Sequence, residues 1–318
     1  MQNLHQPLIN MENIIPPVPR EILEQELTQE KLLRKTNAGN NLIYVVNYHN
    51  APNVTLEIGR LREITFRDAG GGTGMSYDLD DYDTEENPFQ QLLVWNPLDK
   101  EIVGGYRYLH CRDLKPDHNN VYHTPTFKLF KYSDEFLKDY LPYTIELGRS
   151  FVQPNYQPTN NIRKGMYSLD NIWDGLGAVI LQNPDARYYF GKITMYPDYN
   201  PEARDLILYF MQKYFGDSEK LVYPYHPIKL STDPKILEST FKNNVYEKDY
   251  KVLIQKVRAL GESIPPLVNA YMNLSSTMKF FGTAINPGFG EVEESGILIT
   301  IADIYGMKIE RHLSVPQE

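Results

Sequence analysis

The sequence predicts a mixed α/β fold, of the α+β kind, in which helices flank a mostly antiparallel central sheet. A short turn at 97–100 separates two apolar segments, 89–96 and 101–109, and this pattern is typical of an antiparallel hairpin. Farther along the chain, the strand-like segments 143–152 and 188–196 flank a helix-like segment, as in a strand–helix–strand crossover. A sheet with both connections is mixed, because a purely parallel sheet has no place for the hairpin.

The N-terminal region, residues 1–41, is predicted to be an arm followed by a helix. Residues 1–18 end in the stretch IIPPVP, which favours an extended chain, and the helix begins at Pro19, where proline fits the first turn. Apolar residues then recur at helical spacing until the Asn- and Gly-rich segment 37–41 ends the helix. The next elements expected are a strand, a helix and an irregular loop, at 42–48, 54–65 and 70–86.

The second half of the chain is predicted to contain mainly helices and strands in alternation. A short helix is expected within the otherwise irregular segment 110–142. The later elements expected besides the two crossover strands are four helices and a last strand, at 165–182, 201–215, 246–260, 265–281 and 296–304. The chain has no internal repeat and no low-complexity segment, so one mixed sheet with helical additions accounts for the whole order.

Composition and charge exclude several classes of protein. The chain has 318 residues, of which 42% are hydrophobic and 23% charged, so it is globular rather than disordered. Its 32 Lys and Arg against 41 Asp and Glu give a net charge of −9, which argues against nucleic-acid binding because such proteins need a basic face. Cys111 is the single cysteine, which excludes an internal disulfide. The His and Asp residues around it, in segment 110–123, match no common zinc spacing, so no metal site is expected.

The protein is expected to be cytoplasmic. The N-terminus lacks the basic start and apolar stretch of a signal peptide. No apolar run approaches the roughly 18 residues that a membrane-spanning helix requires. Peripheral contact with the inner face of a membrane stays open, because composition does not test it.

Two polar segments invite a functional interpretation. The glycine-rich loop 70–74 follows a helix and lacks the Lys and Ser or Thr of a phosphate-binding loop, which favours a flexible loop. The segment 77–86 holds six acids and no base. It is either a solvated loop or a site in which Asp80, Asp81 or Asp83 binds a cationic group such as an amine.

The strand at 143–152 carries the strongest functional signal. Glu146 and Arg149 lie among apolar neighbours, and a half-buried strand seldom carries two charges without a role. In a regular strand these side chains would point to opposite faces, because they are three positions apart. Gly148 between them favours a β-bulge, which would turn both toward one side. The strand therefore carries either a structural ion-pair network or a site formed with the N-terminus of the following helix.

Several motifs together resemble one known family. They are LREITF at 61–66, DLDDYD at 78–83, the hairpin, ELGRSFV at 146–152, IWDGLGAVI at 172–180 and IPPLVNAYMNLSSTMKFFGTAINPGFG at 264–290. With these motifs the chain resembles the acyltransferase-5 branch of the GNAT superfamily, which holds ornithine- and glycine-lipid N-acyltransferases often labelled hemolysin-like. The resemblance implies a GNAT-like domain at 42–305 with an insertion at about 216–262, followed by a C-terminal tail at 306–318.

The chain is also distantly similar to acyl-homoserine-lactone synthases. The site of those enzymes is formed by an Arg–x–x–x–Phe element, an acidic D–x–x–D element and a Glu–x–x–Arg strand, with a further arginine. The matching positions are Arg62 and Phe66, Asp80 and Asp83, Glu146 and Arg149, and Arg107. By this resemblance the substrate-binding residues would be Arg62, Phe66, Asp80, Asp83, Arg107 and Ser150.

Both families move a fatty acyl group from acyl carrier protein to an amine. The resemblance therefore implies transfer of a long-chain, 3-hydroxy acyl group to the amine of glycine or ornithine, the first step of aminolipid synthesis. Glu146 would remove a proton from the amine, and Arg149 would orient Glu146 or hold the substrate carboxylate. Tyr196 or Tyr199 would protonate the leaving thiolate. No bound cofactor is implied, since acyl carrier protein or coenzyme A delivers the acyl group as a co-substrate.

The donor side departs from the pattern of GNAT enzymes that use acetyl-CoA. Those enzymes hold the pyrophosphate in a glycine-rich turn, whereas the turn NNIRKGMYS lacks the second glycine. The loss favours a donor held through its carrier protein, with pantetheine along the strand. The donor-binding residues expected are Phe151, Val152, Arg163, Lys164 and Gly165. The apolar helix predicted at 265–281 either lines a groove for the acyl chain or packs on the sheet.

Two other functions stay open from the sequence. One is a small-molecule N-acetyltransferase of the same superfamily, which a preference for acetyl-CoA would indicate. The other is a non-enzymatic, hemolysin-like protein. The sequence has no basic amphipathic helix or membrane-inserting stretch that would support lysis.

Overall fold

An eight-stranded sheet forms the centre of the fold, which is described by a computed structural model covering residues 11–119 and 121–313. Residues 1–10 of the predicted arm and 314–318 of the predicted tail lie outside this description. The strand order is β1-β2-β3-β4-β6-β7-β10-β9. Neighbouring strands are antiparallel except β6 and β7, which run parallel. This topology confirms the predicted mixed, mostly antiparallel sheet.

Along the chain, a long and mainly helical segment separates the first six strands of the large sheet from the last two. Those of the large sheet are β1 (Leu32–Lys35), β2 (Leu42–Val46), β3 (Gln90–Asn96), β4 (Glu101–His110), β6 (Thr144–Val152), β7 (Tyr188–Met195), β9 (Lys279–Asn286) and β10 (Val292–Thr300). A second, two-stranded sheet pairs β5 (Phe130–Tyr132) with β8 (Val222–Pro224). The predicted hairpin is present as β3 and β4.

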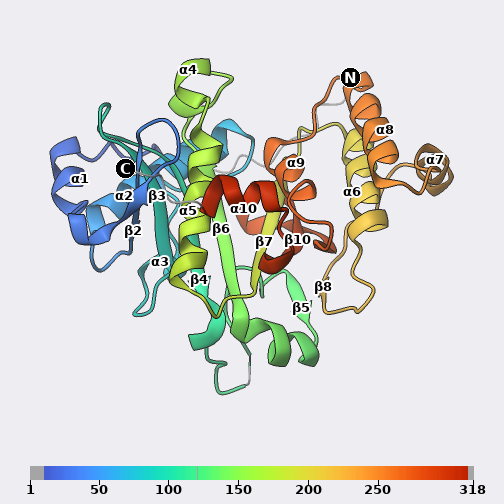
Figure 1. Ribbon diagram of the computed structural model, residues 1–318, viewed down its shortest axis with the longest axis horizontal. Helices are drawn as coiled ribbons and strands as arrows, with labels where there is room; N and C mark the ends of the chain where they lie inside the picture. The colour runs from blue at the N-terminus through green and yellow to red at the C-terminus, as the bar shows by residue number, and fades with distance from the viewer. Residues whose placement is uncertain (1–10, 120, 314–318) are drawn as a thin grey trace.

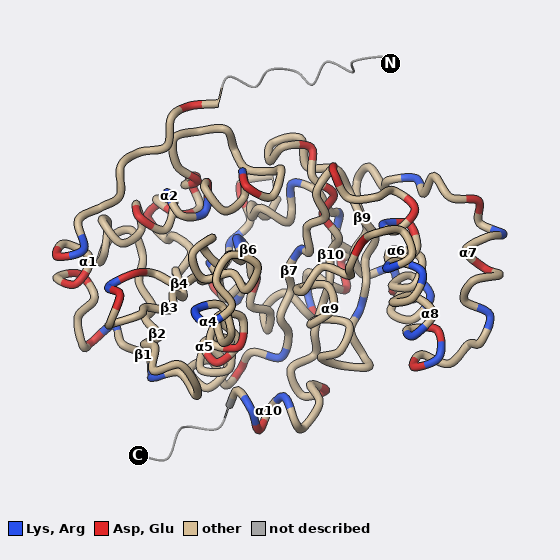
Figure 2. Tube along the Cα trace, turned by 90° about the horizontal axis from the view of Figure 1, so that it is seen from above, with Lys and Arg blue, Asp and Glu red and all other residues tan. Residues whose placement is uncertain are grey.

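Helices cover both faces of the large sheet (Figure 1). They are α1 (Arg20–Glu26), α2 (Pro52–Asp68), α3 (Asp81–Thr84), α4 (Ile162–Gly165), α5 (Ser168–Gln182), α6 (Pro201–Phe215), α7 (Pro234–Thr240), α8 (Tyr246–Ala259), α9 (Pro266–Met272) and α10 (Gly306–Leu313). Figure 2 shows α2 and α10 on opposite sides of the strands. The two faces are named below after α2 and α5.

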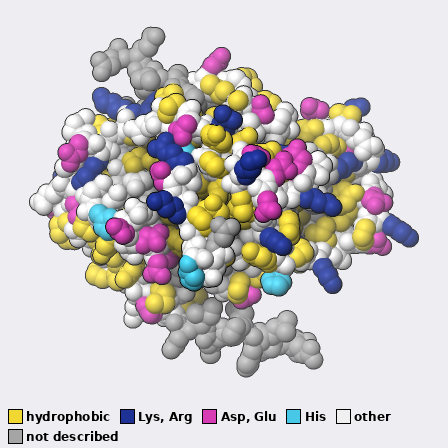
Figure 3. Space-filling model, turned by 90° about the horizontal axis from the view of Figure 1, so that it is seen from below, with side chains coloured by type: hydrophobic (Ala, Val, Ile, Leu, Met, Phe, Trp, Pro, Cys, Tyr) yellow, Lys and Arg dark blue, Asp and Glu magenta, His cyan; other side chains and the backbone are white. Residues whose placement is uncertain are grey.

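Three apolar clusters fix these layers. The largest lies on the α5 face, where side chains of α5, α6, α8 and α9 pack on β4, β6 and β7. A second cluster on the α2 face joins α1 and α2 to β2 and β3. A third, rich in aromatic side chains, lies beneath the small sheet and includes Phe130, Phe136 and Phe190. Outside these clusters charges are mixed, and in the view of Figure 3 acidic and basic side chains are interspersed with hydrophobic ones.

Several predicted elements were placed wrongly. The first helix ends at Glu26, and Leu32–Lys35 is instead a strand that pairs with β2. The helix predicted at 265–281 ends at Met272, and Lys279–Asn286 is a strand paired with β10. The last strand covers Val292–Thr300 rather than 296–304. In each case hydrogen bonds to a neighbouring strand of the sheet override local propensity.

The chain end predicted as a tail contains a helix. α10 packs against α5, and the ring nitrogen Nδ1 of His312 lies 2.8 Å from Oδ1 of Asp174. Asp174 also accepts from the backbone N–H of Asn37, at 2.9 Å. The C-terminal helix is thereby fixed to both α5 and the loop after β1. Among the described helices, none is long and apolar enough to cross a membrane.

Candidate active site

The predicted bulge in the strand at 143–152 is present in β6. Opposite Tyr106 of β4, the strand carries two residues, Arg149 and Ser150, where a regular ladder has one. Arg149 has a φ of 51°, in the left-handed region that residues other than glycine seldom adopt. Its guanidinium lies on the α2 face, 4.2 Å from the ring centroid of Phe289.

Glu146 lies where β6 and β7 separate. The parallel register of these strands runs from Thr144 to Glu146, whereas β7 stays paired with β10 as far as Met195. Ile145 and Leu147 pack in the core of the α5 face, so Glu146 between them points to the α2 face. The bulge therefore brings Arg149 to the same face as Glu146, as the sequence predicted.

Three arginines and three aspartates form a buried cluster beside the bulge. Arg62 comes from α2, Arg107 from β4 and Arg149 from β6. Two of the aspartates precede α3 and the third lies within it. The cluster consists of Arg62, Arg107, Arg149, Asp78, Asp80 and Asp83. By formal charge the three cations balance the three anions, so the cluster as a whole is neutral.

Arg107 lies at the centre of this arginine–aspartate cluster. Its guanidinium donates to both oxygens of Asp80, at 2.7 and 2.9 Å, and to Asp83 at 2.8 Å. Asp83 is fully buried and also lies 3.3 Å from Arg62. Gln91 bonds both Asp83 and Arg62, which closes the inner side of the cluster.

Electrostatic interactions inside the cluster favour the charged forms of Arg107 and Asp83. Burial alone would lower the pKa of Arg107, but Asp83 and Asp80 outweigh burial and hold that pKa above its ordinary value. Burial likewise would raise the pKa of Asp83, but Arg107 and Arg62 hold it below the usual range. For Asp78 the balance differs, because burial raises its pKa more than Arg149 lowers it.

The acidic segment 77–86 is solvated only in part, because Asp81, Glu85 and Glu86 are exposed and the other acids are not. Asp78 and Asp83 are buried and bound by arginines of the protein itself. Asp80 keeps 34% of its side-chain surface exposed, which makes it the accessible carboxylate of the arginine–aspartate cluster. The glycine-rich loop at 70–74 is also held in place, because Glu63 accepts hydrogen bonds from its backbone and from a threonine hydroxyl.

Glu146 is enclosed by the loop before β5. Its carboxylate accepts from the backbone N–H of Thr126 at 3.3 Å and from the hydroxyls of Thr124 and Thr126. Burial raises the pKa of Glu146 above its usual value, although these hydrogen bonds and the charge of Lys192 act in the opposite direction. A carboxyl group with a raised pKa suits general-base chemistry near neutral pH.

Two charged residues of this region were missed in the sequence. Lys192 of β7 lies 2.5 Å from Glu294 of β10, and both side chains are largely buried. The rule that singled out Glu146, a charge within an apolar strand, also applies to Lys192. Glu294 lay outside its predicted strand, so no pattern marked it. Together with Glu146 of β6, these two residues form a row of charged side chains across β6, β7 and β10, the polar strip.

Three aromatic residues that were also predicted for the site have different environments in the structure. Phe66 packs edge-to-face on Phe289, with 5.1 Å between ring centroids, and so belongs to the apolar wall. Tyr196 follows β7 on the α2 face, where burial and Glu294 raise its pKa to about 12. The hydroxyl of Tyr199 instead donates to the carbonyl of Ser263, at 3.0 Å.

The predicted donor turn is built differently from a phosphate cradle. Lys164 forms an ion pair with Asp99 at 2.7 Å, while Arg163 is exposed. Gly165 is needed for packing, because a Cβ atom there would come within 2.4 Å of the backbone nitrogen of Pro158. Phe151 lies in the α2-face core and Val152 against the α5-face core, as the last residues of β6.

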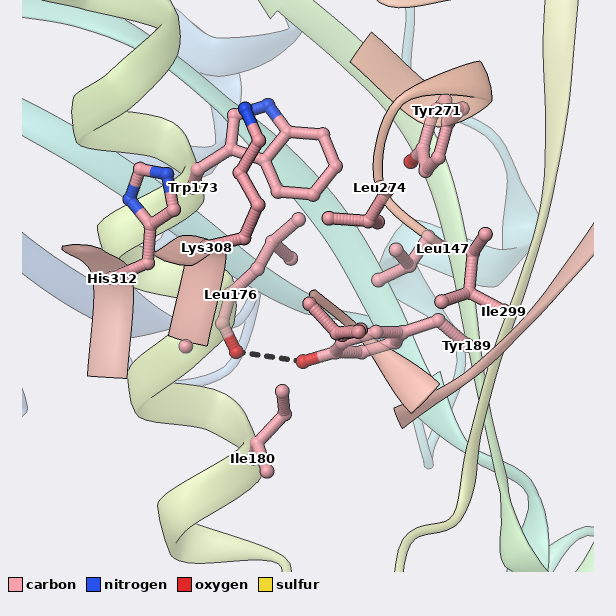
Figure 4. A pocket seen from close by; sticks show the side chains of 12 residues that line it. Leu147, Trp173, Leu176, Ile180, Tyr189, Tyr271, Leu274, Ile299, Lys308 and His312 are labelled. Atoms are coloured by element: carbon pink, nitrogen blue, oxygen red, sulfur yellow. Dashed lines mark hydrogen bonds between the residues drawn. The ribbon is translucent and has the colours of Figure 1, made fainter. Parts of the chain in front are cut away.

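A small apolar cavity lies on the α5 face, between α5, α9 and α10 (Figure 4). Leu147 and Tyr189 of the sheet, Tyr271 of α9 and Lys308 of α10 are among its lining residues. Its volume of about 30 Å³ holds about one or two water molecules, so a long acyl chain does not fit in this conformation. Among the described residues, no group of His, Cys, Asp and Glu is arranged to hold a metal ion.

Comparison with known proteins identifies the family. The model of an acetyltransferase (GNAT) domain matches residues 61–164, which include the arginine–aspartate cluster and β6. A glycine N(alpha)-acyltransferase of Phocaeicola vulgatus is 54% identical over 303 residues, covering 95% of this chain and 93% of its own. The chain belongs to the GNAT acyltransferases. Its relative from Bacteroides thetaiotaomicron, of the same name, is also 54% identical and is covered over 90% of its length.

This N-acyltransferase is also similar to solved structures of acyl-homoserine-lactone synthases. LasI aligns over 88% of this chain and 100% of its own, with 12% identity and a TM-score of 0.41. BjaI, a CoA-dependent synthase, aligns over 87% and 91% with 11% identity and a TM-score of 0.36.

Proposed function

We propose that this N-acyltransferase moves a long-chain, 3-hydroxy fatty acyl group from acyl carrier protein to the amine of glycine. The relatives that are 54% identical carry glycine in their names, and this similarity favours glycine over ornithine as acceptor. The product is an N-acyl amino acid, the first intermediate of an aminolipid. We place the reaction in the cytoplasm, at the inner face of the membrane that receives the lipid.

The observation that carries the mechanism is the position of Glu146. Its carboxyl group lies on the α2 face where β6 leaves β7, and burial raises its pKa. An α-amine is mostly protonated at neutral pH and must lose a proton before it attacks a thioester. Glu146 accepts that proton, directly or through one water molecule.

The bulge supports the next step of this mechanism. The thioester oxygen becomes negative in the tetrahedral intermediate and is stabilised by N–H donors that are already in place. We assign this role to backbone N–H groups of β6 near Gly148 and Ser150, where the ladder with β7 has ended. Arg149 on the same face holds the carboxylate of the acceptor, and Asp80 at 34% exposure lies beside it, 3.9 Å from Arg149.

The donor is held mainly through its carrier protein in this proposal. Lys164 is already paired with Asp99, and Gly165 is used for packing against Pro158, so this turn has few groups left for a pyrophosphate. Exposed Arg163 is available to the phosphate of a pantetheine arm. Acyl-CoA would then be a poorer donor than acyl carrier protein with the same acyl group.

The test is lipid mass spectrometry of cells that express the intact protein, Glu146→Gln or Glu293→Gln. Glu293 is the matched control, because it lies on β10 and pairs with Arg204 outside the site. We expect N-acylglycine with the intact protein and the control, and a loss of about 100-fold or more with Glu146→Gln. Undiminished N-acylglycine in Glu146→Gln would remove Glu146 as the base.

Purified enzyme then tests donor and acceptor separately. Acyl carrier protein and coenzyme A thioesters of one 3-hydroxy fatty acid are compared, with glycine or ornithine as acceptor. A higher kcat/KM for the carrier-protein donor with glycine is the expected result. Acetyl-CoA as the preferred donor would support the small-molecule acetyltransferase instead.

A further inference from the structure

Three hydroxyl groups form a hydrogen-bonded chain on the α5 face, directly behind the bulge. The hydroxyls of Tyr106 and Tyr271 lie 3.3 Å apart, and the side chain of Ser150 is hydrogen-bonded to Tyr106. Tyr106 and Tyr271 are buried, with 3% and 5% of their surfaces exposed, whereas Ser150 is half-buried. The chain of hydroxyls thus runs from a half-buried residue into the core.

This hydroxyl chain and Glu146 lie on opposite faces of the sheet. Tyr106 and Tyr271 belong to the apolar core of the α5 face, whereas Glu146 points to the α2 face. Ser150 is one of the two bulge residues opposite Tyr106. At this level β6 is no longer paired with β7, so a thioester placed between the strands has Glu146 on one side and the hydroxyls on the other.

We propose that the chain Ser150–Tyr106–Tyr271 protonates the leaving sulfur of the acyl donor. The inference rests on the proposed function, in which the amine attacks from the α2 face. As the new C–N bond forms, Glu146 takes a proton from the amine. As the C–S bond breaks, the sulfur takes a proton from the Ser150 hydroxyl, which is restored from Tyr106 and Tyr271. The tyrosines recover their proton, and Glu146 loses its own, by exchange with solvent.

This assignment differs from the tyrosines that the sequence suggested. Tyr199 already donates to the carbonyl of Ser263, and Tyr196 lies on the α2 face with the acceptor. The hydroxyl chain lies in an otherwise apolar region, where a thiolate without a donor would be strongly destabilised. Fixed hydroxyls in such a region are worth more than in water, because the local dielectric is low.

The test uses two donors with the same fatty acyl group and leaving thiols of different acidity. One is the thioester of N-acetylcysteamine, an alkyl thiol, and the other is the thioester of a more acidic aryl thiol, which needs no proton to leave. Rates with glycine are measured for the intact enzyme, Tyr106→Phe, Tyr271→Phe and Tyr189→Phe. Tyr189 is the matched control, because its buried hydroxyl lines the same face but donates to the carbonyl of Leu176 at 2.7 Å (Figure 4).

We expect Tyr106→Phe and Tyr271→Phe to lower kcat with the alkyl thioester by about 100-fold, and with the aryl thioester by about tenfold or less. Tyr189→Phe should leave both rates within about threefold of the intact enzyme. Equal losses with both donors would overturn the proposal, because they indicate oxyanion binding or a packing defect. No loss in either variant would also overturn it. The same fatty acyl group on acyl carrier protein is the reference donor, and an intact enzyme that makes no N-acylglycine even from this donor would refute the proposed function itself.

Discussion

The arginine–aspartate cluster allows a quantitative prediction about stability. Replacing Arg107 with methionine keeps most of the side-chain volume but removes the bonds to Asp80 and Asp83. Asp83 is fully buried and would keep Arg62, at 3.3 Å, as its one cationic partner in the arginine–aspartate cluster. The cluster would then contain two cations and three anions. Breaking a buried ion pair in this way costs about 3–5 kcal/mol, whereas half-exposed Asp80 regains water and adds about 1 kcal/mol at most.

The assay is urea unfolding at neutral pH, followed by circular dichroism. Arg107→Met should lose about 3–5 kcal/mol of unfolding free energy, a large share of the roughly 5–15 kcal/mol typical of a domain. Arg20→Met is the matched control, because Arg20 forms an ion pair with Glu101 while 53% exposed and should change stability by about 1 kcal/mol or less.

A double variant tests the reasoning behind this prediction. Asp83→Asn alone leaves a net positive cluster, whereas Arg107→Met with Asp83→Asn restores formal neutrality. The double variant should therefore be less destabilised than the sum of the two single variants. Strictly additive losses, or an Arg107→Met loss no larger than that of Arg20→Met, would refute the argument that a stranded buried charge is the cause.

Two further predictions concern the base and the donor turn. Thr126→Val removes a hydroxyl that lowers the pKa of Glu146. Because the base must be ionised, the acid-side limb of the pH profile of kcat/KM should move to higher pH. A limb that does not move would contradict the role of Glu146 as the base. Gly165→Ala should cost about 1–3 kcal/mol in thermal unfolding, because the added Cβ meets the backbone of Pro158, whereas Gly306→Ala, with open space around it, should cost nothing.

The bulged strand β6 was predictable because its signal is local. The signal lies within the four residues from Glu146 to Arg149. Because these two charged residues are an odd number of positions apart, only a bulge brings both side chains to one face of the sheet. The hairpin of β3 and β4 was predictable for a similar reason, since the turn and both strands are contiguous. In both cases the pattern and the structure that it predicts lie in one segment of the chain.

Features that depend on distant partners were not predictable in the same way. The acidic segment 77–86 has no basic residue of its own, and its neutralising arginines come from α2, β4 and β6. Lys279–Asn286 follows a helix and continues its apolar composition, but it becomes a strand because it pairs with β10, which itself pairs with β7, a strand much earlier in the chain. The pairing of Tyr106 with Tyr271 spans 165 positions, which no spacing rule reaches.

The early end of the β6–β7 ladder gives the sheet an edge in its interior. By its place in the strand order β6 is a central strand, yet beyond Glu146 its side toward β7 no longer has a ladder partner among the described strands. Such edges bind extended chains through main-chain hydrogen bonds, irrespective of side-chain identity. An extended ligand with amide groups can therefore hydrogen-bond to the backbone of β6 in the middle of the sheet. The two outermost strands, β1 and β9, need not change for this.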